Sequence, residues 1–497
     1  MEALSLFIVI PFMAAFLIVL SSSIWRKYLP DIIANISSVS TAVLAVMVFA
    51  KVASKPSVIL IHKIGGWAPP FGIPIIADGL SAFLLAIANL VSLAVIIYSV
   101  GYINTYTDKW KYYALLMLMM GGVNGVLLTG DIFNLFVFLE IASIATYTLV
   151  AFGTEAEAFE ASFKYAIMSA VASSFILIGI IFIYGYTSTL NMADMAMVFR
   201  SAGHVDLVKF VAVLFLMGFG LKTAAVPFHG WLPDSYTKAP ATIPAMSSGV
   251  LLKTLGIYVI CRIFFNVLGM SLSISYVLIG LGVSSMIVGA IMAFGQTNMR
   301  RLLGYSSISQ VGYILLGFGI GTPLAIAGSL FHILNHSFAK SLLFLNSGDI
   351  EQGRALSTER VFGIIDQRPI CGYTGLLAAM SICGIPPLAG FWSKLIIIFA
   401  CIQSGHPILM VIAAAVSIVT LAYYLKFFNP LLFGTKKNIL SDGQSFAVNL
   451  AMVILALGVL FGGLVWLPGP RSFIINTAVN VMTGGLAYAD IVFGAIK

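Results

Sequence analysis

Apolar runs long enough to cross a lipid bilayer recur along this chain almost from end to end. The chain is 60% hydrophobic and only 9% charged, which excludes a soluble globular protein. A helix needs about 20 consecutive apolar residues to span a bilayer, so the pattern predicts an all-α polytopic membrane protein. The first run, 2–21, has neither a basic n-region nor a clear small-residue cleavage site, and we expect it to be retained as a span.

Fourteen segments are predicted to be transmembrane helices. They are 2–21, 31–52, 79–102, 112–129, 131–152, 163–186, 208–233, 243–267, 271–294, 304–320, 324–346, 374–402, 407–432 and 446–468. The tail 472–497 is apolar but contains Asn476, Asn480 and Asp490, so it is either an interfacial helix or a fifteenth span.

The loop cations set the orientation that we expect, because Lys and Arg gather on the inner side of a membrane. With the N-terminus outside, fourteen of them fall inside and eight outside. The inner set is Arg26, Lys27, Lys109, Lys111, Lys164, Lys238, Arg300, Arg301, Arg354, Arg360, Arg368, Lys426, Lys436 and Lys437. The outer set is Lys51, Lys55, Lys63, Arg200, Lys209, Arg262, Arg471 and Lys497. We therefore expect a multi-pass protein of the cell (inner or plasma) membrane with both termini outside.

Two predicted spans contain prolines where a helix should continue. Pro227 lies in the seventh span, and Pro386 and Pro387 lie in the twelfth. Proline removes a backbone donor and breaks the helix, and within a membrane the freed groups must face protein or water. Both places read Pro-x-x-Gly-aromatic, at 227–231 and at 387–391.

The two breaks lie five spans apart, an odd number that gives the two copies opposite topology. Broken helices at matching places in inverted repeats indicate a transport site. We therefore expect two inverted five-helix repeats. The expected parts are 1–111 (helices 1–3), 112–268 (first repeat, helices 4–8), 269–432 (second repeat, helices 9–13) and 433–497 (helix 14 and the apolar tail).

Five ionisable side chains lie inside the apolar runs, where such groups are costly and usually serve an ion or proton path. They are Glu140, Lys222, Lys253, Lys340 and Lys394. Glu140 lies nine residues past Asp131, the expected helix cap, so it is about 13.5 Å into a hydrocarbon core of about 30 Å. Snorkelling to the interface explains Lys340, near the end of its span, but not the other three lysines. A purely structural pair is the alternative for Glu140 and Lys222.

The eleventh span carries His332, His336 and Lys340 at i, i+4 and i+8, which is one face of a helix. Histidine titrates near neutral pH and therefore suits a proton relay. A zinc site is the alternative, but no acidic or cysteine partner lies nearby in the sequence, and we expect no metal. His229, just after the Pro227 break, is either another relay group or a polar group at a helix end.

No cofactor site or nucleic-acid site is visible in the sequence. The four cysteines are scattered in or beside the spans without a Cys-x-x-Cys pair, which argues against an iron–sulfur cluster or a disulfide framework. The chain has no Gly-x-Gly-x-x-Gly after a strand and no Walker loop. Its formal net charge of +8 is explained by cations in short loops. The buried charges therefore indicate proton transfer rather than catalysis in this chain.

Four stretches resemble one family of membrane proteins. They are 129–140 (TGDIFNLFVFLE), 221–234 (LKTAAVPFHGWLPD), 301–313 (RLLGYSSISQVGY) and 384–394 (GIPPLAGFWSK). They are similar to the antiporter-like subunits of respiratory complex I and to the large subunits of Mrp-type sodium/proton antiporters and of membrane-bound hydrogenases. The resemblance covers spans 3–14, and the pattern leans towards the D-type Mrp subunit or the related hydrogenase subunit.

The resemblance implies fourteen helices with inverted five-helix repeats and broken seventh and twelfth helices. It implies that Glu140 and Lys222 form the controlling ion pair, that Lys253 and the two histidines relay protons, and that Lys394 faces the exit. Some family members carry glutamate in place of Lys394, so this chain departs from them. The implied partners are other membrane subunits of a hetero-oligomeric complex, and the implied ions are protons and, in the Mrp case, sodium.

Two other classes of protein fit the sequence less well. A stand-alone secondary transporter of a small solute or anion needs an arginine or a polar cluster at the broken helices, which are mainly apolar here. A structural scaffold does not explain charges near the midplane. The sequence therefore predicts a proton-translocating subunit of a larger complex. It leaves open whether that complex is an Mrp antiporter or an oxidoreductase of the complex I or hydrogenase type.

Overall fold

The computed structural model describes residues 4–22, 25, 28–55, 59–106, 108–202, 206–353, 362–435 and 445–496. Nearly every segment within these ranges is helical, because a helix satisfies its own backbone hydrogen bonds where no water can do so. Ten helical stretches in the described part of the chain are long and apolar enough to cross a membrane. The polytopic helical class predicted from the sequence is confirmed.

The helices of the first half cover the first eight predicted spans. They are α1 (Leu6–Ser21), α2 (Leu29–Ser54), α3 (Gly79–Tyr102), α4 (Lys109–Leu128), α5 (Ile132–Val150), α6 (Ala156–Thr187), α7 (Met192–Ala202), α8 (Asp206–Thr223), α9 (Trp231–Lys238) and α10 (Thr242–Met246). After α10 the same rod continues through a π-helix η5 (Ser247–Tyr258), α11 (Val259–Cys261) and a second π-helix η6 (Arg262–Val267). The short helix α7 was not predicted.

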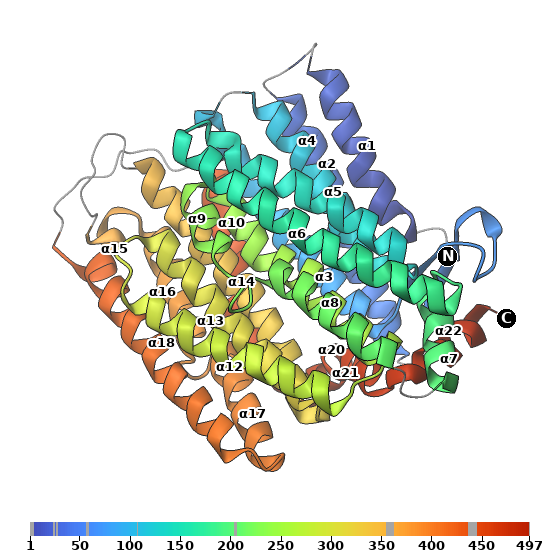
Figure 1. The fold of residues 1–497 in the computed structure, drawn as a ribbon. Helices are drawn as coiled ribbons and strands as arrows, with labels where there is room; N and C mark the ends of the chain where they lie inside the picture. The colour runs from blue at the N-terminus through green and yellow to red at the C-terminus, as the bar shows by residue number, and fades with distance from the viewer. Residues whose placement is uncertain are drawn as a thin grey trace.

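The second half continues the bundle. Its helices are α12 (Leu272–Phe294), α13 (Met299–Ile320), α14 (Pro323–Gly353), α15 (Ile364–Gln367), α16 (Pro369–Cys383), α17 (Ala389–Gln403), α18 (Pro407–Phe433), α19 (Phe446–Gly462), α20 (Pro468–Ile474), α21 (Asn476–Thr483) and α22 (Tyr488–Ile496). Figure 1 shows α1 and α2 at one edge of the bundle and α17 and α18 at the opposite edge. Between them, α14 packs against helices of both halves, among them α3, α10, α13, α16 and α17.

A small β-hairpin makes the all-α prediction incomplete. The strands β1 (Leu60–Lys63) and β2 (Pro74–Ala77) pair antiparallel between α2 and α3. The Gly130 N–H donates to the carbonyl of Pro74 at 2.9 Å, so β2 also contacts the extended break between α4 and α5. The segment is too short and too rich in glycine and proline to show the alternating pattern by which a strand is recognised.

The tail does not form a fifteenth span in the described residues. It folds as the three short helices α20, α21 and α22, the longest of which has 9 residues. Nine residues rise only about 13.5 Å as a helix, less than half of a hydrocarbon core of about 30 Å. The helix α22 packs instead on α7 and β1, where the Arg200 guanidinium bonds the Asp490 carboxylate at 2.5 Å.

Several of the loop cations used to predict the orientation lie outside the described residues. They are Arg26, Lys27, Arg354, Arg360, Lys436, Lys437 and Lys497. The outward placement of both termini therefore stays a prediction. The tail, α7 and the hairpin meet at one end of the bundle, where the described ends of the chain also lie (Figure 1).

Both helix breaks occur where the prolines predict them. The first lies between α8 and α9 around Pro227, and the second between α16 and α17 around Pro386 and Pro387. The residue three positions before the proline that opens each Pro-x-x-Gly-aromatic motif is left-handed: φ is 53° at Ala224 and 85° at Gly384. The backbone hydrogen bonds around the two positions follow the same pattern.

The left-handed Ala224 generates a stability prediction. Its Cβ crowds the following carbonyl at a cost of roughly 1–2 kcal/mol, and glycine has no Cβ. We expect Ala224→Gly to raise the apparent Tm of the purified protein by a few degrees. Ala225→Gly is the matched control, because Ala225 is equally buried but is not left-handed, and it should lower the Tm. Equal losses in both variants would contradict the assignment.

Candidate functional site

Glu140 and Lys222 meet across α5 and α8. The Lys222 Nζ lies 3.5 Å from the Glu140 Oε1, and Ser173 of α6 donates a hydrogen bond to the same carboxylate oxygen. The ammonium also donates to Ser143 at 2.9 Å and to Ser169 at 2.7 Å. The predicted ion pair is therefore present, and three serines that the sequence analysis did not single out complete it.

The two members of this pair differ in exposure. The Lys222 side chain is 3% exposed, whereas that of Glu140 is 28% exposed on the outside of the chain. The helix that carries Glu140 begins at Asp131, whose carboxylate accepts the Asn134 N–H at 2.7 Å as a cap. This cap, identified in the sequence, fixes the depth of Glu140 within α5.

Lys253 lies in the π-helical part of the rod that follows the first break. Its Nζ is 2.5 Å from the Nδ1 of His336 on α14. π-Helical turns are rare and frequently occur at functional sites. The rod packs on α8 at Gly256, where any Cβ would collide with Thr223, the neighbour of Lys222. Lys222 and Lys253 thus lie on helices in close contact, although no direct hydrogen bond joins them.

The two histidines of α14 are fully buried and face the second break. The Nδ1 of His332 bonds the Ser393 hydroxyl at 2.9 Å, and the two imidazole centroids are 6.2 Å apart. Among the described residues, the Nε2 atoms of both histidines and the side-chain amide of Gln310 on α13 have no protein partner. Buried polar atoms of this kind are normally satisfied by ordered water.

Lys394 follows Ser393 on α17 and turns back into the break. Its Nζ donates to the carbonyl of Ile382 at 2.8 Å, a carbonyl that the broken helix leaves free. The ammonium also lies 5.3 Å from the centre of the Tyr313 ring, within the range of a cation–π interaction. The broken helix therefore supplies a neutral acceptor for a buried cation.

Lys340 corrects one interpretation of the sequence. Snorkelling is wrong for this residue, because its side chain is fully buried between helices. The Nζ donates to the carbonyl of Leu303 at 3.0 Å and to the hydroxyl of Tyr424 at 3.3 Å. The helix α14 runs 31 residues and continues to Gly353, well past the predicted end of the span at 346, so the interface is further away than expected.

His229 stands apart from the other groups. It lies in the first break with its ring 6.5 Å from that of Tyr305, and its Nδ1 has no partner among the described residues. No hydrogen bond links it to Lys222 or to Lys253. In the described chain, no group of three or more His, Cys, Asp or Glu side chains converges as metal ligands do. The structure thus leaves His229 unconnected to the line from Lys253 to Lys394.

A further buried pair was missed at the end of η6. Arg262, predicted as a loop cation on the outer side, is buried and bonds Asp78 at 2.7 Å. Its guanidinium also lies over the rings of Tyr258 and Tyr488. Asp78 caps α3, so the pair joins the start of α3 to the end of the rod. Because it contacts none of the relay groups, we assign it a structural role.

The chain is similar to known membrane proteins over most of its length. Residues 129–420 match the family model described as NADH:quinone oxidoreductase/Mrp antiporter, transmembrane. A D-type Na+/H+ antiporter protein of Alkalihalophilus pseudofirmus is 34% identical over 76% of this chain and 77% of its own length. An N-type NADH-quinone oxidoreductase protein of Desulforudis audaxviator is 34% identical over 73% of this chain and 74% of its own length.

Solved structures agree over nearly the whole chain. A chain of the Mrp complex from Dietzia sp. DQ12-45-1b has a TM-score of 0.90 at 28% identity, covering 99% of both chains. A chain of the membrane-bound sulfane sulfur reductase, an archaeal respiratory membrane complex, has a TM-score of 0.91 at 29% identity, covering 99% of this chain and 100% of the other. Each of these chains comes from a membrane complex.

The buried Asp78–Arg262 pair predicts a stability effect. Asp78→Asn removes the counter-charge and leaves the guanidinium buried, which typically costs about 3–5 kcal/mol. We expect a large drop in the apparent Tm in detergent. Asp206→Asn is the control, because its pair with Lys209 is 96% and 71% exposed and should matter little. Equal Tm values for the two variants would show that the buried pair is not needed for stability.

Proposed function

This chain belongs to the NADH:quinone oxidoreductase/Mrp antiporter transmembrane family, and we propose that it translocates protons as one subunit of a larger membrane complex. The curated relatives are subunits of a sodium/proton antiporter and of a quinone oxidoreductase, and the similar structures come from membrane complexes. The partners that we propose are therefore other membrane subunits, in the cell membrane.

The observation that carries the proposal is a line of protonatable groups through the bundle. Lys253 bonds His336, His332 follows one turn away, and Ser393 links His332 to the segment of Lys394. A neutral imidazole accepts a proton on one nitrogen and releases one from the other. These groups lie one after another and do not surround a cavity, which favours proton transfer over binding of a solute.

The Glu140–Lys222 pair suits a control element. A buried ammonium is stable only while a counter-charge or acceptors hold it. At 3.5 Å the carboxylate is a loose partner, and Ser143 and Ser169 hold the ammonium more closely. If the carboxylate is neutralised or turns away, Lys222 loses the balance of its charge and releases a proton towards the adjacent rod of Lys253. Glu140 is the partly exposed member, so a neighbouring subunit can act on it.

We also propose the finer architecture that the sequence predicts. It consists of fourteen spans, with the repeats 112–268 and 269–432 inverted relative to each other and flanked by 1–111 and 433–497. Support comes from the helices found at every predicted span and from the matching backbone of the two breaks. The proposed orientation, with both termini outside, agrees with the meeting of the tail, α7 and the hairpin at one end of the bundle.

The ion that is exchanged and the source of energy belong to the whole complex. This chain shows no redox-cofactor motif. One curated relative is named as a sodium/proton antiporter subunit and another as a quinone oxidoreductase subunit. We propose the proton as the ion carried by the buried line and sodium as the counter-ion if the complex is of the antiporter type.

Removing the charge of Glu140 tests the control element. In the assembled complex reconstituted in vesicles, Glu140→Gln should reduce proton transport at least about tenfold, equivalent to roughly 1.4 kcal/mol, because Lys222 loses its counter-charge. Proton movement is followed with a pH-sensitive dye. The control is Glu157→Gln, an exposed carboxylate in the first turn of α6. Normal transport by a correctly assembled Glu140→Gln complex would refute the proposed function.

Lys394 is tested at the other end of the line. Lys394→Met keeps the length of the side chain but removes the protonatable amine, so proton release should fall about tenfold or more while assembly is retained. The same vesicle assay applies, with assembly checked by co-purification of the other subunits. Lys209→Met, at an exposed position, is the control. A wild-type rate in the Lys394 variant would exclude this residue from the path.

A further inference from the structure

A pocket of about 450 Å³ opens at one end of the second half of the bundle. Loop residues 295–298 and the ends of α9, α14 and α18 surround it. Its polar lining includes Gln296, Asn298, Arg300, Ser347, Glu351 and Lys426. All of these lie on the side for which the sequence predicts the excess of loop cations, which is the inner side.

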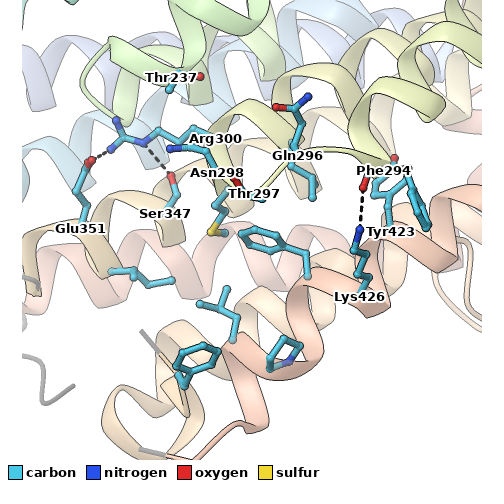
Figure 2. A pocket seen from close by; sticks show the side chains of 17 residues that line it. Thr237, Phe294, Gln296, Thr297, Asn298, Arg300, Ser347, Glu351, Tyr423 and Lys426 are labelled. Atoms are coloured by element: carbon cyan, nitrogen blue, oxygen red, sulfur yellow. Dashed lines mark hydrogen bonds and ion pairs between the residues drawn. The ribbon is translucent and has the colours of Figure 1, made fainter. Parts of the chain in front are cut away.

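The cations of this pocket are already engaged by the protein. Arg300 donates to the carbonyl of Ala239 at 2.9 Å and forms an ion pair with Glu351. Lys426 donates to the carbonyl of Phe294 at 3.3 Å and lies 4.5 Å from the centre of its ring. Figure 2 shows the Arg300–Glu351 and Lys426–Phe294 contacts, with Tyr423 beside Lys426. A site built for an anion would leave its cations free, so the pocket is better suited to hold water.

One wall of the pocket begins a hydrogen-bonded chain into the core. Tyr423 lines the pocket, and its hydroxyl donates to the Ser306 Oγ at 2.8 Å. The Ser306 Oγ lies 3.3 Å from the Tyr424 hydroxyl, which in turn lies 3.3 Å from the Lys340 Nζ. All four side chains are buried. The chain therefore connects a water-accessible pocket with a relay lysine without a break.

We propose that this pocket is the proton entrance from the inner side and that Tyr423, Ser306 and Tyr424 conduct protons to Lys340. The inference rests on the proposed function and adds to it the route of entry, which the line from Lys253 to Lys394 lacks.

The transfer balances through the hydroxyl groups alone. A protonated water in the pocket gives its proton to the Tyr423 oxygen, which passes its own proton to Ser306. Ser306 passes its proton to Tyr424, and Tyr424 passes its proton to the lone pair of neutral Lys340. Each hydroxyl has one donor and two acceptor positions, so it can gain and lose a proton in the same step. Rotation of the hydroxyls then restores the starting arrangement.

Removing single hydroxyls tests the chain. In the assembled complex in vesicles, Tyr423→Phe and Ser306→Ala should each slow proton uptake from the inner side about tenfold, because each interrupts the chain. The matched controls are Tyr98→Phe and Ser329→Ala. Their buried hydroxyls donate to the backbone carbonyls of Leu345 and Ile314, outside the chain. Equal rates for the Tyr423 and Tyr98 variants, with normal assembly, would overturn the proposal.

Blocking the pocket is an independent test. Thr297 is exposed and lines the pocket, and the four native cysteines are buried. A bulky membrane-impermeant thiol reagent added to the inner side should label Thr297→Cys and reduce transport about tenfold. The control is labelled Ser201→Cys, on exposed α7 at the far end, treated from its own side. Full transport after labelling, or no labelling from the inner side, would overturn the entrance.

The two proposals can fail separately. If Glu140→Gln stops transport while Tyr423→Phe and labelled Thr297→Cys run at the wild-type rate, the relay stands and the entrance lies elsewhere. If the wild-type complex moves no protons, the proposed function itself fails. The measured rates of the unmodified complex and of Glu140→Gln therefore serve as reference values for every variant of the entrance.

Discussion

A charged side chain in an apolar bundle must find its partners inside the protein, and this constraint organises the structure. Each buried lysine meets it differently. Lys222 has a carboxylate and two serines, Lys253 an imidazole, Lys340 a carbonyl and a tyrosine, and Lys394 a carbonyl freed by a broken helix. Of these four lysines, only the first is held by an opposite charge among the described residues. The others have neutral partners, which hold a cation loosely enough for its proton to move on.

The broken helices and the π-helical rod serve the same need. A continuous helix uses its own carbonyls, whereas the break at Pro386 and Pro387 leaves that of Ile382 free for a lysine. The π-helical turns around Lys253 bring its amine to His336, and the absence of a side chain at Gly256 lets the rod approach α8. Backbone irregularity is tolerated here because it is enclosed by other helices rather than by lipid.

Some features could not be read from the sequence for identifiable physical reasons. The serines around Glu140 and the tyrosines around Lys340 are ordinary residues of apolar helices, and only helix packing brings them near a charge. Arg262 looked like a loop cation because its partner, Asp78, is far away in the chain. The hairpin at 60–77 was missed because its strands of four residues are too short to show a period.

The sequence by itself determined the helical class, the two breaks, and the residues Glu140, Lys222, Lys253, His332, His336 and Lys394 as the unusual polar groups. It did so because charge and proline are costly in an apolar run wherever the run lies in the fold. Only the tertiary structure decided which of these groups touch and which, like His229, stand apart. It also decided that Lys340 is enclosed rather than at the interface, because contact depends on how the helices pack.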